Sequence, residues 1–150
     1  MNKINSVIAL VLVIALSALA FACAPAKAPL DPDAAFEKIL SEVKFAETLE
    51  DASSYAEYTL GELPEGAEAR IYTAGGQNVD CAMLIKVQNE ADISVVENAV
   101  KAYIESMMDE AQHYDPAQLP KLEKARTKVL GTSYIVVVTD DIEAVNRILY

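Results

Sequence analysis

The segment Tyr134-Ile135-Val136-Val137-Val138 is apolar at every position. A strand that is apolar on both faces is typical of the centre of a sheet covered on both sides. The turn residues Gly131 and Thr132 separate this segment from Leu122–Leu130, and two such runs joined by a short turn predict a hairpin. We therefore expect a sheet whose central strand occupies residues 134–139 and which needs cover on both faces.

The same order of elements occurs twice after residue 68. Residues 69–73 and 79–88 predict a first hairpin, and Ile93–Gln112 then carries an apolar stripe at helical spacing. A second helix is expected at 141–149, directly after the second hairpin, with Asp140 as its cap. The two halves together predict a ββα-ββα unit.

Two further helices are expected before this unit. One opens at Asp31-Pro32-Asp33, where an acidic residue and a proline suit the first helical turn, and a weaker one covers Ala52–Leu60. The chain therefore predicts a single α+β domain over residues 31–150. In it, N-terminal helices precede the ββα-ββα unit, and the helices pack on a four-stranded, mainly antiparallel sheet.

Residues 1–22 have the parts of a secretory signal. Lys3 precedes the apolar run Val7–Leu16, and small residues dominate positions 17–22. An uncleaved transmembrane helix is the alternative, but spanning a bilayer takes about 20 apolar residues. The sequence therefore predicts export.

Cys23 follows the small residue Ala22, as the acylated cysteine does in a bacterial lipobox. Phe21 is bulkier than a lipobox prefers, and Ala20-Phe21-Ala22 also fits ordinary signal peptidase, which would leave the protein secreted. With Cys23 acylated, a Pro/Ala-rich tether over residues 23–30 would hold the domain at the outer face of the cell membrane.

Charge and motifs exclude several classes of function. Lys and Arg number 12 against 23 Asp and Glu, a net charge of −11, whereas nucleic-acid binding needs a cationic surface. No EF-hand, P-loop, GxSxG, HExxH or CxxC pattern is present, and His113 is the single histidine. We therefore predict no catalytic residue, metal or cofactor, and we expect Cys81, on one face of an alternating strand, to lie in the core.

Three stretches carry a resemblance to a known family. They are Phe36-x-Lys38-Ile39-Leu40-x-Glu42-Val43-x-Phe45, then Tyr114-Asp115-Pro116-x-x-x-Pro120-Lys121-Leu122-Glu123, and Gly131-x-x-Tyr134 leading to Asp140-Asp141. In them the chain resembles an uncharacterised family of small bacterial lipoproteins that carry a domain of unknown function. The resemblance implies export, a lipid anchor and one domain, with no catalytic residue to transfer. It also implies an association with membrane enzymes that modify surface polymers.

Cations gather in one short stretch of this acidic chain. Lys124, Arg126 and Lys128 alternate along a predicted strand, so their side chains are expected on one face. We interpret that face as a docking surface for an anionic surface polymer or an acidic envelope protein; a solvated sheet face is the alternative. The candidate binding residues are Tyr114, Lys121, Lys124, Arg126 and Lys128, which Arg70, Tyr72 and Lys86 would join if they share the face.

The sequence thus favours an exported, lipid-anchored, non-enzymatic accessory or binding module at the cell envelope, supporting a membrane enzyme that acts on surface polymers. The alternative is a small envelope hydrolase or transferase with a carboxylate-lined site. Convergence of Asp80, Asp140 and Asp141 in one pocket would favour this alternative. Helix capping otherwise explains the pair Asp140-Asp141.

Overall fold

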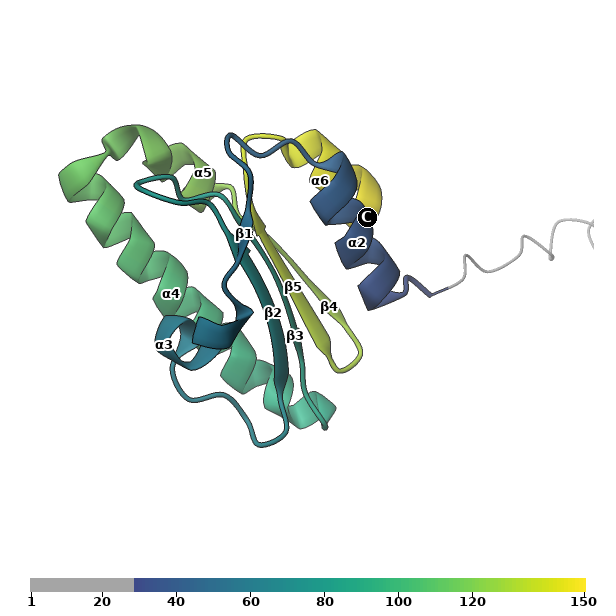
Figure 1. Ribbon diagram of the computed structural model, residues 1–150. Coiled ribbons are helices and arrows are strands. Elements are labelled where there is room, and N and C mark those ends of the chain that lie inside the picture. The colour runs from purple at the N-terminus through teal and green to yellow at the C-terminus, as the bar shows by residue number, and fades with distance from the viewer. Residues whose placement is uncertain (1–28) are drawn as a thin grey trace, which may run out of the picture.

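Five antiparallel strands form one sheet in the computed structural model, which describes residues 29–150 (Figure 1). Their order across the sheet is β1-β2-β3-β5-β4. The strands are β1 (Glu50–Asp51), β2 (Glu68–Thr73), β3 (Cys81–Lys86), β4 (Arg126–Leu130) and β5 (Ser133–Val138). The helices are α2 (Pro32–Glu42), α3 (Ala56–Leu60), α4 (Ile93–Tyr114), α5 (Leu119–Glu123) and α6 (Ile142–Leu149). The predicted α+β class is confirmed.

The sheet has one strand more than the sequence predicts. In β1, Glu50 pairs with Thr73 and Asp51 pairs with Tyr72 at the edge of the sheet. Both residues of β1 are exposed, so no apolar alternation marks the strand in the sequence. The prediction of four strands was wrong for this reason.

Helices cover both faces of the sheet, as the apolar sequence of β5 requires. All six residues of β5 are buried. Helices α2 and α6 lie on one face, whereas α4, with α3 and α5 near it, lies on the other (Figure 1). The expectation that this strand is covered on both faces is confirmed, and β5 lies in the interior of the sheet between β3 and β4, whereas the middle strand of the five is β3.

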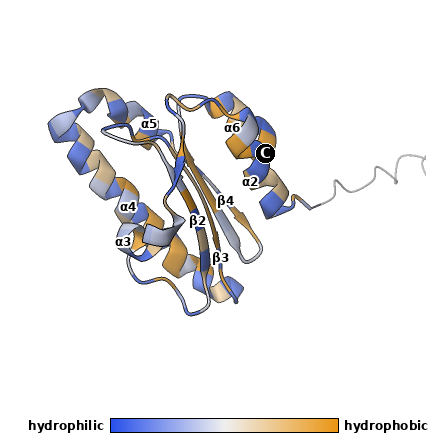
Figure 2. Ribbon diagram, viewed as in Figure 1, coloured by the Kyte–Doolittle hydropathy of each residue, from blue (hydrophilic) through white to orange (hydrophobic). Residues whose placement is uncertain are grey.

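Alternate residues of the central strands enter two separate cores. In β3, Ala82 and Leu84 belong to the core beneath α2 and α6, whereas Cys81, Met83 and Ile85 belong to the core beneath α4. Hydrophobic residues accordingly colour the middle of the sheet in Figure 2. Cys81 is 1% exposed, so its predicted place in the core is confirmed.

The last helix begins one residue later than predicted. Asp141, not Asp140, is the N-cap residue of α6, and its carboxylate accepts a hydrogen bond of 3.3 Å from the backbone N–H of Ala144. The side chain of Asp140 is 79% exposed. Two adjacent aspartates offer equivalent capping chemistry, so the prediction that Asp140 caps the helix was wrong.

The expected strand at 122–130 is divided into a helix and a strand. Pro116 opens a 3-10 turn over Pro116–Gln118, Pro120 lies in the first turn of α5, and β4 begins only at Arg126. Prolines suit the first turn of a helix because they lack the N–H that is unpaired there. Lys124 therefore ends α5 and does not alternate with the residues of β4, contrary to the prediction.

The part of the chain that the structure describes holds no helix long and apolar enough to cross a membrane. The predicted signal at 1–22, Cys23 and the tether up to residue 28 lie outside the described residues.

Candidate functional site

Four of the cations singled out in the sequence, Arg70, Lys86, Arg126 and Lys128, share one face of the sheet. Arg70 pairs with Leu84 in the β2–β3 ladder, and Lys128 pairs with Ile135 in the β4–β5 ladder. Leu84 and Ile135 both belong to the core beneath α2 and α6. The face is therefore covered by two helices along its middle, and only its margins reach solvent.

On the β2–β3 side, acids of α2 neutralise these cations. Arg70 lies 2.7 Å from a carboxylate oxygen of Glu37 and 4.0 Å from one of Asp33. Lys86 lies 2.6 Å from the other oxygen of Asp33. This half of the face is an ion-paired seam between helix and sheet, not an open cationic surface.

On the β4 side, the cations have no carboxylate partner. Arg126 donates a hydrogen bond of 3.2 Å to the amide oxygen of Asn146, and the Lys128 ammonium lies 4.5 Å from the centre of the Tyr150 ring. Within residues 29–150, no carboxylate oxygen lies within 4.0 Å of the charged groups of Lys124, Arg126 or Lys128. The predicted binding role of these residues stays a prediction, now confined to the β4 edge.

Lys121 lies in the interior, away from the β4 edge. It is 7% exposed, and its ammonium lies 2.9 Å from Oδ1 of Asp80 and 3.6 Å from Oδ2 of Asp140. Asp80 is itself 1% exposed, and its Oδ2 accepts a hydrogen bond of 2.6 Å from the backbone N–H of Ala46. The pair joins α5 to the start of β3 and to the loop after α2, so we assign Lys121 a structural role.

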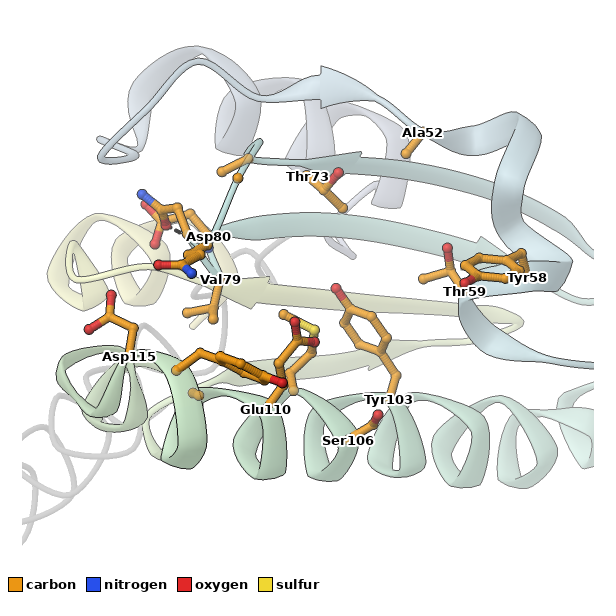
Figure 3. A pocket seen from close by; sticks show the side chains of 17 residues that line it. Ala52, Tyr58, Thr59, Thr73, Val79, Asp80, Tyr103, Ser106, Glu110 and Asp115 are labelled. Atoms are coloured by element: carbon orange, nitrogen blue, oxygen red, sulfur yellow. Dashed lines mark hydrogen bonds between the residues drawn. The ribbon is translucent and has the colours of Figure 1, made fainter.

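A groove of about 500 Å³ opens beside this ion pair, on the α4 side of the sheet (Figure 3). Its walls are the C-terminal half of α4, helix α3, and the turn that joins β2 to β3. Tyr103, Ser106 and Glu110 rise from α4 toward the strands, and Tyr58 and Thr59 close one end from α3 (Figure 3). The groove brings together residues that lie far apart in the sequence.

The lining of the groove is aromatic and acidic. Tyr58 is 92% exposed and Tyr114 is 72% exposed, whereas Tyr103 is half-buried. Burial raises the pKa of the Tyr103 hydroxyl, which is therefore a protonated donor at neutral pH. Asp80, Glu110 and Asp115 also line the groove, and no Lys, Arg or His in the described range 29–150 does. A groove of this composition repels anions and suits polar or cationic ligands.

Two of the three carboxylates in the groove are already engaged. Asp80 holds Lys121 and the Ala46 N–H. Asp115 accepts hydrogen bonds from the backbone N–H of Ala117 and the side-chain amide of Gln118, at 3.3 and 3.0 Å. Glu110, by contrast, forms no ion pair or side-chain hydrogen bond with any residue in the range 29–150, and it is the carboxylate open to a ligand.

The residues proposed for the enzymatic alternative do not meet in one pocket. Asp80 lines the groove, but Asp140 and Asp141 do not. Asp141 instead binds the backbone N–H of Lys44 at 3.1 Å while it caps α6. Over residues 29–150, no group of three His, Cys, Asp or Glu side chains is placed to hold a metal ion.

The groove was not predicted from the sequence. Tyr114, a predicted docking residue, lines it, whereas Tyr103 reads as one more apolar position in the stripe of the long helix. Tyr58 and Glu110 carry no motif, and their helices meet the β2–β3 turn only in the folded chain. Periodicity places a residue on a face of a helix but does not show where two helices leave a gap.

The fold and groove define a small α+β domain with a polar, acidic groove. Family comparison adds that a domain of unknown function, DUF4358, is found at residues 67–139. This range runs from the start of β2 to the end of β5 and includes α4, so it holds most of the groove. Comparison with curated proteins and with solved structures gives no match.

Proposed function

We propose that the protein is an exported, lipid-anchored binding module at the outer face of the cell membrane, and that the groove between α4, α3 and the β2–β3 turn is its ligand site. The ligand class is a polar molecule that carries ammonium groups, such as an amino sugar of a surface polymer. The observation that carries this proposal is the lining of the groove, which combines three tyrosines with the open carboxylate of Glu110 and, among the described residues, includes no Lys, Arg or His.

Tyrosine rings beside a carboxylate are suited to an ammonium group. A cation over an aromatic ring gains about 0.5–1 kcal/mol at an exposed site, and Glu110 supplies the compensating charge. The protonated Tyr103 hydroxyl and the Ser106 hydroxyl add hydrogen-bonding groups for the rest of the ligand. The net charge of −11 also attracts cationic ligands at long range.

Binding is favoured over catalysis by the state of the carboxylates. Hydrolysis by a carboxylate pair needs two groups free to exchange a proton or to attack the substrate. Asp80 and Asp115 are held by donors of the fold, so Glu110 alone is open. A non-enzymatic module that supports a membrane enzyme acting on surface polymers fits this arrangement better than a hydrolase or transferase.

The position of the groove suits a membrane-anchored module. The groove lies on the α4 side of the sheet, whereas α2, the first helix after the predicted tether, lies on the opposite side (Figure 1). A domain held through Cys23 would thus present the groove away from its point of attachment. The anchor itself is supported by the sequence of residues 1–23.

Calorimetric titration of the full-length protein with two matched sugars tests the proposal. Chitosan oligosaccharide carries an ammonium on each glucosamine, and chitin oligosaccharide is its uncharged, acetylated counterpart. We expect chitosan to bind more tightly, and Glu110→Gln to weaken it about fivefold, because an exposed ion pair contributes up to about 1 kcal/mol.

Glu105→Gln is the matched control, because Glu105 lies on the same helix but outside the groove. Equal affinities for the two sugars would contradict an ammonium site. If the two glutamate substitutions weakened chitosan binding equally, the ammonium group would not bind in the groove.

A further inference from the structure

The strand β4 forms one edge of the sheet and exposes part of its backbone. Only a two-residue turn, Gly131-Thr132, joins it to β5, and Gly131 has the positive φ of 58° that such a turn needs at its first position. In a hairpin closed in this way, Leu130 and then every second residue bond to the partner strand. Thr127 and Val129 consequently direct their backbone groups away from the sheet.

One contact at this edge confirms that direction. The hydroxyl of Tyr150 donates a hydrogen bond of 2.7 Å to the backbone carbonyl of Thr127. No other hydrogen bond involves the outward backbone groups of Thr127 and Val129 within residues 29–150. The edge can therefore accept a further strand at these two residues.

The two sides of the edge differ in chemistry. On the α4 side, Val129 is 43% exposed, and a neighbouring hollow of about 460 Å³ is lined by apolar side chains that include Ile104 and Met108. Charged residues also line this hollow, namely Glu97, Lys101, Glu105 and Glu123. On the α6 side lie Arg126 and Lys128, which have no carboxylate partner within the described residues. A strand added here would place alternate side chains against an apolar wall and a cationic one.

These observations decide what kind of strand fits. Apolar side chains suit the hollow, and acidic side chains on the opposite face suit Arg126 and Lys128. A second copy of β4 does not fit, because an antiparallel pair would set Lys128 opposite its own counterpart, and like charges in that position destabilise a sheet. The occupant is thus a strand from another protein.

We propose that the β4 edge binds an extended segment of a partner protein in which apolar and acidic residues alternate, by adding that segment to the sheet as a sixth strand. The β4 edge lies on a different part of the surface from the proposed ligand groove. Strand binding at this edge is therefore independent of ligand binding in the groove. Tyr150 competes with the incoming strand, because that strand must replace the hydrogen bond from the Tyr150 hydroxyl to the Thr127 carbonyl.

Fluorescence anisotropy with synthetic peptides and the full-length protein tests this proposal. The probe is a labelled peptide in which Val and Glu alternate, and the matched probe has Lys in place of Glu. We expect the Val/Glu peptide to bind and the Val/Lys peptide to bind at least about tenfold more weakly. Tyr150→Phe should raise the affinity for the Val/Glu peptide about twofold to threefold, because the substitution frees the Thr127 carbonyl.

Val129→Pro is the decisive variant. It removes an N–H that points away from β5, so the hairpin keeps its own hydrogen bonds while the edge loses a donor. We expect Val129→Pro to lower the affinity for the Val/Glu peptide about tenfold. Val129→Thr keeps the N–H and should bind the peptide as the unmodified protein does. Circular dichroism of both variants verifies that the fold is intact.

A second pair of variants tests whether the cations of β4 contribute to peptide binding. Lys128→Glu should weaken the Val/Glu peptide severalfold, and Lys38→Glu, an equal change of net charge at an exposed site on α2, should not. Equal binding by the Val129→Pro and Val129→Thr proteins would overturn strand addition. Equal binding of a polyglutamate peptide without valines would also overturn it and assign the edge to anionic polymers.

Discussion

The ion pair between Lys121 and Asp80 gives the sharpest test of how the fold is held together. Substitution Lys121→Met keeps most of the volume of the side chain and removes its charge. Asp80 is then left 1% exposed, and the backbone N–H of Ala46 is the one remaining donor to its carboxylate among the described residues. A buried carboxylate that has lost its counter-ion is strongly unfavourable.

The expected loss of unfolding free energy is about 3–5 kcal/mol. Domains of this size are stable by about 5–15 kcal/mol, so the variant should lose a large share of its stability. Most of this loss reflects the unpaired charge of Asp80 rather than the net value of the pair. The double variant Asp80→Asn with Lys121→Met should therefore recover much of the stability that Lys121→Met alone loses.

Urea unfolding of the full-length proteins, followed by far-UV circular dichroism, measures these differences. Lys124→Met is the control, because Lys124 is an exposed lysine at the end of the same helix. A loss below about 1 kcal/mol for Lys121→Met, equal to that of the control, would refute the reasoning. So would a double variant that loses as much as the sum of its single substitutions.

Two further predictions concern other titratable groups. The backbone N–H of Lys44 is the main cause of the lowered pKa of Asp141. A carboxyl group with a depressed pKa stabilises the fold above its unfolded pKa, and this stabilisation disappears as the pH falls through its folded pKa. The unfolding free energy of Asp141→Asn should therefore fall less steeply than that of the unmodified protein as the pH drops below about 4. Urea unfolding at several pH values measures this, and the same dependence on pH in both proteins would contradict the prediction. Burial raises the pKa of the Cys81 thiol to about 12, so in the Cys23→Ser protein a thiol reagent should label Cys81 only as urea unfolds the chain; rapid labelling of the native protein would contradict a sealed core.

The main lines of the fold follow from the sequence because they rest on strong periodic patterns. The apolar run of β5 predicted a central strand covered on both faces, and the stripe at Ile93–Gln112 predicted the long helix, which extends to Tyr114. The two-residue β1 is too short and too exposed to leave a pattern. Capping by Asp141 rather than Asp140 depends on backbone angles that neighbouring aspartates do not distinguish.

The roles of the candidate site residues were harder to predict because they depend on tertiary contacts. Alternation correctly put Arg126 and Lys128 on one face, which Arg70 and Lys86 also share. It could not show that Lys124 ends α5, or that acids of α2 pair with Arg70 and Lys86. Lys121 is buried because Asp80, which directly precedes β3 and is distant in sequence, compensates its charge. Charged residues are almost never buried unless paired, and sequence spacing does not reveal such partners.

Our central proposal is that Cys23 anchors the protein outside the cell membrane and that Glu110 binds ammonium-bearing ligands in the groove. Retention of fluorescent chitosan oligosaccharide by spheroplasts tests both parts in one measurement. Cells that make the unmodified protein should retain the probe, Glu110→Gln cells should retain much less, and Cys23→Ser should move the binding activity to the medium. Equal retention with all three proteins, or with cells that lack the protein, would contradict the account.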